Sequence, residues 1–211
     1  MPAPEPADPA VLFEKAWADG DNTAIELPAV DVNDILDRRY SVQPATHFTG
    51  ASLWDMEVRK AMAPDVYLPR VVRPGSVERF PSEFRGLTEY FTRISDQRLW
   101  LDGTRHGRVI EHVQLDHAGR RAFFIGAPEF RTPDGRELRA GSEQPLFHVE
   151  HSVEGSEDRP LNIWRIVLVT PAFDEALAEV FRTIGADPYL RDFIEIYLWR
   201  DLQRDLYRLP A

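Results

Sequence analysis

Residues 107–127 read GRVIEHVQLDHAGRRAFFIGA, and this stretch decides the fold class. Both halves are rich in β-branched and aromatic residues, which is typical of strands, and His117-Ala-Gly119 between them is turn-forming. Two strands joined by so short a turn must pair antiparallel, because a parallel crossover needs about a dozen residues or more. The sequence therefore predicts an antiparallel hairpin near the middle of the chain.

Similar segments flank this hairpin on both sides. Asp102-Gly103 and Pro133-Asp-Gly135 are further turn signals that separate them. A short extra strand is expected at residues 45–49, before the main series. The chain thus predicts a meander of about six strands, at 66–73, 89–101, 107–116, 120–127, 146–152 and 161–170.

Helical periodicity precedes the meander. We expect a helix from Pro9 to Gly20, a second one capped by Asp31, and a third over residues 51–63. Ser52-x-x-Asp55 resembles a capping box for the third helix, and Pro64 ends it.

Helical periodicity also follows the meander. A helix is expected after Pro171, and another begins at Asp187-Pro188, which fit an N-cap and a first helical residue. The last of these helices carries a broad apolar stripe. Such a stripe must be buried, most simply against the concave face of the sheet. The stripe consists of Leu190, Ile194, Leu198, Leu202 and Leu206.

The order of elements predicts an α+β fold, with a curved antiparallel sheet of about six strands wrapped on a long C-terminal helical segment. This order is similar to the helix-grip architecture of START-like proteins and polyketide cyclases, in which a cavity lies between sheet and helix. The similarity is one of element order. A cone-shaped fold like that of nuclear transport factor and ketosteroid isomerase is the alternative, and a closed lipocalin-like barrel is the third. All three place a pocket inside a curved sheet.

Length and composition indicate the domain organisation and limit the classes of partner. The chain has 211 residues, 43% of them hydrophobic, which suits one α+β domain over residues 10–211 after a proline-rich tail, residues 1–9, that we expect to be extended or disordered. The net charge is −10 without a Lys/Arg-rich stretch. This balance argues against nucleic acid or a membrane surface as partner.

The absence of certain residues and motifs excludes further classes. There is no cysteine, no leader-like N-terminus and no run of apolar residues long enough to span a membrane, so we expect a cytoplasmic protein. No nucleotide-binding, zincin, hydrolase or EF-hand motif occurs, and no cofactor is predicted. Only Lys15 and Lys60 are lysines, against 23 arginines, which we attribute to a GC-rich bacterial genome.

His148-Val-Glu-His151 is the densest group of titratable residues. In a strand, His151 shares a face with its apolar neighbours, whereas His148 and Glu150 share the other face. If the first face is interior, His151 projects into the pocket and suits proton transfer. If the second is interior, His148 and Glu150 form a dyad or hold a metal with a third ligand such as His112 or Glu111. In a third interpretation, these polar residues simply face water.

Two charged residues interrupt apolar rows of predicted strands. Glu111 is either a buried general acid or base with a raised pKa, or the partner of an arginine such as Arg93, Arg98 or Arg165. Arg165 in turn either pairs with a carboxylate, Glu111 or Glu150, or binds an anionic ligand.

Aromatic residues either line an apolar cavity for a ring-shaped ligand or pack in the core. The candidate ligand-binding residues are Arg165, Trp54, Trp100, Phe123 and Trp164.

The sequence favours an enzyme that performs acid–base chemistry of the lyase or isomerase type, as a cyclase, dehydratase or isomerase does, on an apolar or aromatic small molecule. The catalytic candidates are His151, Glu111, His148 and Glu150. One alternative is a carrier that uses the same cavity without chemistry, and another is a metal-dependent enzyme built on His148 and Glu150. The last is a homodimeric interaction domain, for which an exposed Trp199 would provide contact area.

Overall fold

The computed structural model describes residues 8–210. The expected tail therefore lies outside the described residues except for its last two positions. Asp8 is the N-cap of helix α1 (Pro9–Ala18), and its carboxylate accepts a hydrogen bond from the backbone N–H of Ala10 at 2.9 Å. Pro9 takes the first helical position, where its missing N–H costs nothing.

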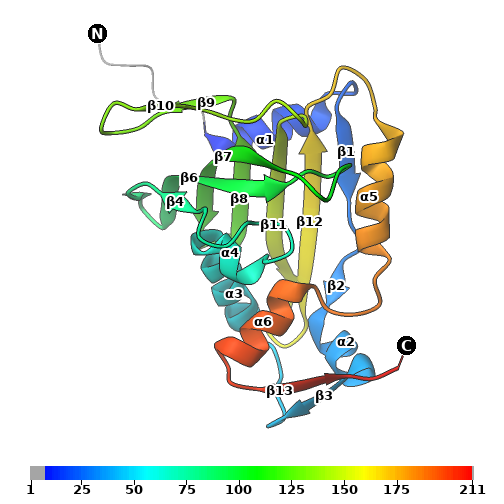
Figure 1. Ribbon diagram of the computed structural model, residues 1–211. Helices are drawn as coiled ribbons and strands as arrows, with labels where there is room; N and C mark the ends of the chain where they lie inside the picture. The colour runs from blue at the N-terminus through cyan, green and yellow to red at the C-terminus, as the bar shows by residue number, and fades with distance from the viewer. Residues whose placement is uncertain (1–7, 211) are drawn as a thin grey trace.

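A curved antiparallel sheet of nine strands forms the body of the molecule (Figure 1). The strands are hydrogen-bonded in the order β1-β12-β11-β8-β7-β6-β4, with β2 beside β12 and β5 beside β6. Their bounds are β1 (Thr23–Glu26), β2 (Val30–Asp31), β4 (Glu78–Arg79), β5 (Glu83–Arg85), β6 (Thr88–Arg98), β7 (His106–Asp116), β8 (Arg121–Gly126), β11 (Phe147–Gly155) and β12 (Pro160–Leu168).

Two short two-stranded sheets complete the strand content of the described chain. One is the hairpin of β9 (Glu129–Arg131) and β10 (Glu137–Arg139), which turns at the predicted Pro133-Asp-Gly135. The other joins β3 (Tyr40–Gln43) to β13 (Asp205–Arg208), two segments from nearly opposite ends of the chain.

The five strands predicted from 89 to 170 are confirmed as β6, β7, β8, β11 and β12, but the other two predicted strands are wrong. Residues 66–73 form the end of helix α4 (Pro64–Tyr67), a turn and a single bridge between Val72 and Gln97 of β6, because Pro64 both ends the preceding helix and starts a new one. Residues 45–49 pair with no strand. The backbone N–H of Phe48 donates instead to the side chain of Asn33, at 2.8 Å.

Between β2 and β4 lie the helices α2 (Val32–Arg39), capped by Asp31 as predicted, and α3 (Gly50–Met62). The capping box of α3 lies three residues earlier than predicted. Thr49 is the N-cap, and its side chain accepts from the backbone of Ser52 while the Ser52 hydroxyl interacts with the backbone N–H of Thr49.

The long last helix is the largest error of the sequence analysis. The structure has α5 (Glu175–Gly185) and α6 (Asp192–Arg200), after which the chain turns into β13. Gln203 has a φ of 52°, and Leu206 pairs with Val42 of β3. Leu202 and Leu206 still pack on the core, so their spacing reflects burial rather than a continued helix.

The two faces of the sheet have different coverings. Helix α1 packs on the convex face, where Phe13 contacts Phe123. Helices α3, α5 and α6 lie on the concave side (Figure 1). No helix within residues 8–210 is both long and apolar enough to cross a bilayer.

This arrangement confirms the predicted α+β fold of the helix-grip type. A curved antiparallel sheet encloses helices on its concave side, and helices follow the last strand of that sheet. The sheet is not a closed barrel, because its strand order begins at β1 and ends at β4.

Candidate functional site

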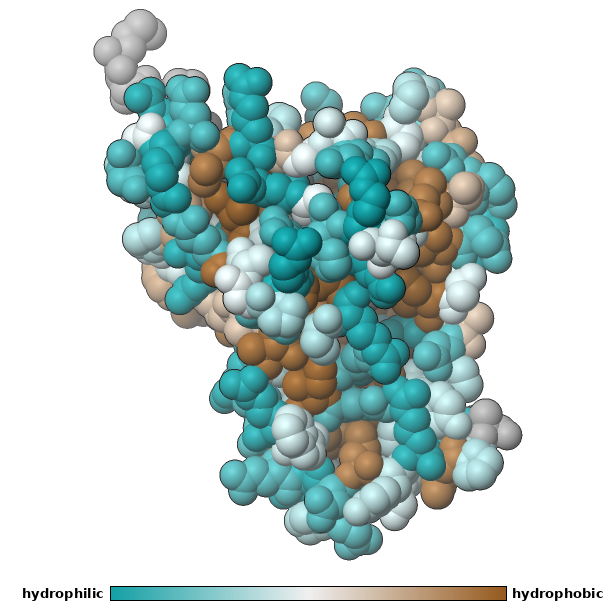
Figure 2. Space-filling model, in the orientation of Figure 1, coloured by the Kyte–Doolittle hydropathy of each residue, from teal (hydrophilic) through white to brown (hydrophobic). Residues whose placement is uncertain are grey.

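A cavity of about 550 Å³ lies between the concave face of the sheet and the helices that cover it. Its walls are mainly aromatic and aliphatic, which suits an apolar ligand. The aromatic wall consists of Trp100, Phe124, Phe147, Trp164, Phe181 and Phe193. On the face drawn in Figure 2, apolar side chains reach the surface between polar ones, among other places over α5.

Charged side chains also line the cavity, from the segment after α4, from the α5–α6 connection and from the first residue of α6. They include Arg70, Asp187, Arg191 and Asp192. Arg70 and Asp192 form an ion pair at 3.2 Å, which links the segment after α4 to α6.

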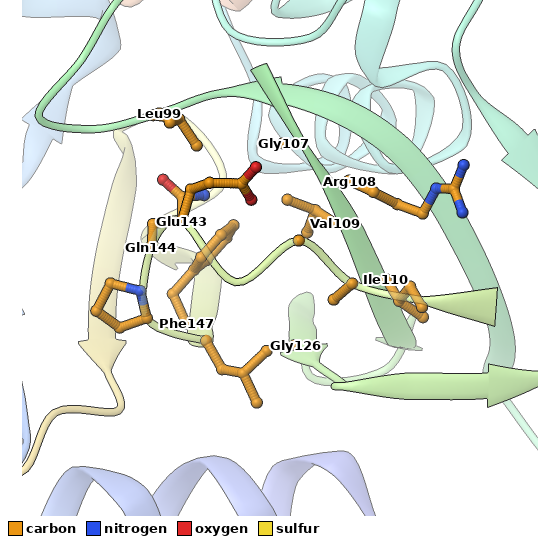
Figure 3. Close-up of a pocket in the computed structure, with 13 residues that line it drawn as sticks. Leu99, Gly107, Arg108, Val109, Ile110, Gly126, Glu143, Gln144 and Phe147 are labelled. Carbon is orange, nitrogen blue, oxygen red and sulfur yellow. The ribbon is translucent and has the colours of Figure 1, made fainter. Parts of the chain in front are cut away.

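A second cavity of about 20 Å³ lies beside Gly107, Val109 and Phe147 (Figure 3). Its volume is that of about one water molecule. It is therefore too small for a substrate, and the larger cavity is the candidate site.

Three ionisable side chains meet at the large cavity, and two of them, Lys60 and His151, line it. Lys60 of α3 places its Nζ 2.6 Å from Nδ1 of His151 on β11 and 2.5 Å from Oε2 of Glu57. The other carboxylate oxygen of Glu57 accepts from the amide of Asn162 on β12, at 2.8 Å. Glu57, Lys60 and His151 are all buried, so their charges interact with little screening by water.

Burial and mutual charge shift the pKa values of all three groups. Burial lowers the pKa of Lys60 to about 8, although the Glu57 carboxylate opposes the fall. Burial and the charge of Lys60 lower the pKa of His151 to about 4. Burial alone would raise the pKa of Glu57, but Lys60 and His151 outweigh it and lower the value to about 2. At neutral pH Glu57 is therefore ionised, Lys60 is protonated and His151 is neutral.

Aromatic rings fix the position of this group. The imidazole of His151 stacks on Trp164 with a centroid distance of 4.2 Å and an interplanar angle of 5°. Trp164 stacks in turn on Phe193 of α6, at 5.2 Å. The Lys60 ammonium lies 3.9 Å from the centroid of Phe193, a cation–π contact.

A second charged pair lies in the same wall. Arg93 of β6 donates from Nε to Glu111 of β7 at 2.8 Å, and from Nη1 to the carbonyl of Ala61 at 2.7 Å. The amide of Gln97 also donates to the Glu111 carboxylate, at 3.3 Å. Glu111 thus has an arginine partner, as one of the two interpretations of the sequence predicted, and it also faces the cavity.

The structure separates the two catalytic histidine candidates. His151 lines the cavity, whereas His148 and Glu150 lie on the opposite face of β11, because side chains alternate along a strand. Glu150 accepts from Arg121 at 2.6 Å and from Arg165 at 2.5 Å. The expectation that His148 and Glu150 act inside the cavity is therefore corrected. Within residues 8–210 no group of three or more acidic or histidine side chains is placed to hold a metal.

Some of the predicted ligand-binding residues also line the cavity, and others lie on the opposite face of the sheet or in the core. Trp100 and Trp164 line the cavity. Arg165 lies on the convex face, where it pairs with Glu14 of α1 and Glu150.

Phe123 and Trp54 also lie away from the cavity lining, and this corrects their expected role. Phe123 packs on Phe13 of α1. Trp54 packs in the core and donates from Nε1 to His117 at 3.3 Å.

No family model and no curated protein sequence matches this chain. Solved structures do. The ZhuI aromatase/cyclase from Streptomyces sp. R1128 is similar with a TM-score of 0.52 and 10% identity, over 84% of this chain and 95% of that one. Dicamba monooxygenase, solved with bound 3,6-dichlorosalicylic acid, gives a TM-score of 0.56 and 11% identity, over 94% of this chain. The match spans 57% of the monooxygenase.

The fold is a helix-grip fold. At such low sequence identity, the structural similarity supports the fold but assigns no role to any residue of the site. The chemistry of the site therefore follows from the side chains of this chain alone.

Glu57 and Lys60, which complete the group around His151, were not predicted from the sequence. Two opposite charges three residues apart on a helix usually form an exposed pair. One signal was present: Lys60 is one of only two lysines in the chain. We attributed that scarcity to codon usage, although it makes each retained lysine informative.

Proposed function

We propose that this protein is a small-molecule enzyme of the lyase or isomerase type, which moves protons on an apolar, ring-containing substrate bound in the large cavity. The observation that carries the proposal is the presence of His151, Lys60 and Glu111 beside the aromatic and aliphatic wall of the cavity. Ionisable groups in such surroundings interact strongly with charge that develops on a bound molecule. An aromatase/cyclase and a complex with dichlorosalicylic acid among the similar structures support a ring-shaped ligand.

The cavity offers two separate groups for proton transfer. His151 reaches it from β11, and Glu111 reaches it from β7. Cyclases, dehydratases and isomerases often share one elementary step, the removal of a proton next to a carbonyl group. A residue that donates to the carbonyl oxygen and a second that takes the proton are sufficient for that step.

Deuterium exchange of an enolisable ketone tests this step directly. The protein is incubated with saturating 2-tetralone in D₂O, and loss of the α-proton signal is followed by ¹H NMR. We expect exchange well above the buffer rate. His151→Gln and Glu111→Gln should each lower the rate by about 10²-fold or more, while the Kd of 2-tetralone changes by no more than about tenfold, the effect of one net hydrogen bond.

His148→Gln is the matched control, because His148 lies on the other face of the same strand. It should keep the wild-type exchange rate. The enzyme proposal fails if bound 2-tetralone exchanges no faster than in buffer, or if His151→Gln and Glu111→Gln both exchange normally.

A carrier of apolar molecules is the second candidate, and one observation favours it. Glu111 and Glu57 already have cationic partners, Arg93 and Lys60, so each carboxylate is neutralised before any ligand enters. A carrier would bind 2-tetralone in the same cavity without accelerating exchange, and this outcome separates the two candidates.

The expected homodimer stays a prediction, as do the cytoplasmic location and the bacterial origin. Trp199 of α6 is 68% exposed, the feature on which the dimer prediction depends. Sedimentation velocity of the wild type and of Trp199→Ala tests it. A monomer at high wild-type concentration would contradict it.

A further inference from the structure

The ammonium group of Lys60 is held inside the protein by two polar contacts and a cation–π contact. It has three N–H donors and no acceptor. Two of its contacts are with Oε2 of Glu57 at 2.5 Å and Nδ1 of His151 at 2.6 Å, and the third is with the face of the Phe193 ring. At 1% exposure, Lys60 has almost no contact with bulk water that could replace these partners.

The contact with Lys60 decides which nitrogen of His151 carries the hydrogen. A protonated Nδ1 would point its own hydrogen at an ammonium 2.6 Å away, so Nδ1 must be the acceptor. Nδ1 also lies 3.1 Å from Oε2 of Glu57. Both atoms then act as acceptors, and the Lys60 ammonium donates to each of them. A neutral imidazole with an accepting Nδ1 holds its hydrogen on Nε2.

Nε2 is left for whatever occupies the cavity. His151 lines the cavity, and none of the residues from 8 to 210 gives Nε2 a hydrogen-bond partner. The parallel stack on Trp164 fixes the plane of the ring, and the contact of Nδ1 with Lys60 fixes which edge of the ring faces the cavity. The donor therefore has a fixed direction before a ligand binds.

We propose that Lys60 is a positioning residue that holds His151 as the Nε2–H tautomer, and that this N–H binds an oxygen acceptor of the ligand, namely a carbonyl, enolate or phenolate oxygen. The catalytic use of this contact rests on the proposed function above. The tautomer and the preference for an oxygen acceptor do not require turnover.

The same geometry supplies a balanced proton transfer. When an enolate oxygen takes the proton from Nε2, Nδ1 takes one from the Lys60 ammonium. The products are the neutral enol, a neutral Nδ1–H imidazole and a neutral lysine amine. The charged groups that face this path are Glu57 on the same helix as Lys60, and Arg93 from β6. A Lys60 pKa of about 8 suits a group that gives up a proton near neutral pH.

Nitrogen-15 NMR of the ligand-free protein tests the tautomer. The chain has six histidines, and the spectrum of His151→Gln identifies the signals of His151. In the wild type at pH 7 we expect a protonated Nε2 and an unprotonated Nδ1. A protonated Nδ1 on His151 of the wild type would overturn the proposal, whatever the activity of the protein.

Two variants of Lys60 separate a positioning role from a merely structural one. In Lys60→Met the nearest partner of Nδ1 is the Glu57 carboxylate, so Nδ1 should gain the hydrogen. Lys60→Arg keeps a cationic donor and should retain the Nε2–H form. An unchanged tautomer in a folded Lys60→Met would contradict the proposal. If that variant does not fold, the wild-type spectrum still decides.

A matched pair of ligands tests the oxygen acceptor. The probes are 2-acetylnaphthalene and 2-isopropenylnaphthalene, which differ in a C=O against a C=CH₂ of similar shape. We expect the wild type to bind the ketone about 3- to 10-fold more tightly, the range that one net hydrogen bond provides. Lys60→Met should reduce this preference to less than about twofold. Equal affinities in the wild type would refute an oxygen site at His151. A retained tautomer and ketone preference without 2-tetralone exchange would refute the enzyme proposal alone.

Discussion

Glu150 provides the sharpest test of how the two faces of the sheet are assigned. It was a candidate catalytic residue in the sequence, yet its buried carboxylate lies on the convex face between Arg121 and Arg165. The isosteric change Glu150→Gln removes the charge and leaves the shape. We expect a less stable protein whose cavity works normally.

The expected size of the effect comes from the partners that remain. Breaking a buried ion pair typically costs about 3–5 kcal/mol. Here Arg165 keeps Glu14 at 2.6 Å, and the Arg121 side chain is 40% exposed and can hydrate. We therefore expect a loss of about 2–3 kcal/mol, equivalent to a Tm lower by about 5–10 °C in a chain of this size.

Urea unfolding followed by tryptophan fluorescence measures the loss, and deuterium exchange of 2-tetralone measures the site. Glu14→Gln is the control, since the Glu14 side chain is 50% exposed and its loss should cost less than about 1 kcal/mol. Equal stabilities of the two variants would refute the energetic reasoning. Loss of 2-tetralone binding in a stable Glu150→Gln would refute the face assignment.

Three further predictions follow from the structure. Val149→Trp fills the cavity from β11 and should weaken binding of 2-acetylnaphthalene at least tenfold by calorimetry; unchanged affinity would place the ligand elsewhere. The pKa of His151 falls from 6.5 to about 4 on folding, so between these values the unfolded chain binds more protons. Wild-type stability should therefore rise as the pH rises across this window, by up to about 1.4 kcal/mol per pH unit more than that of His151→Gln, and the same pH dependence of the urea-derived stability in both proteins would contradict this. Thr49→Ala removes the N-cap of α3 and should cost about 1 kcal/mol, whereas an unchanged urea midpoint would show that the cap contributes nothing.

The sheet could be predicted because its evidence is local. Strands β6, β7, β8, β11 and β12 alternate over many residues, and several of the connections between them carry strong turn residues. Glu111 and His151 were found for the same reason, since each is a polar side chain in an otherwise apolar row. Which face of each strand points toward the cavity could not be predicted locally, because it depends on the packing of α1 against the other face of the sheet.

The elements that were mispredicted depend on distant partners. Leu202 and Leu206 continue the spacing of four residues that is typical of a helix. The backbone of residues 205–208 instead forms hydrogen bonds with β3, which lies far away in the sequence. Glu57 and Lys60 resemble an exposed pair until His151 and Asn162, about a hundred positions later, are seen to face them. The spacing of residues along the sequence does not indicate such long-range contacts.

The pairing of β3 with β13 has a consequence for the order in which the protein matures. Strand β3 leads into α3, which carries Lys60, and β13 follows α6, which carries Phe193. The wall around His151 thus needs a segment near the start of the chain and one near its end. During synthesis, which proceeds from the N-terminus, the sheet can form while α6 is still within the ribosome. A ligand would therefore find a complete cavity wall only after α6 has emerged, and nascent chains that end before α6 should fold a sheet without binding.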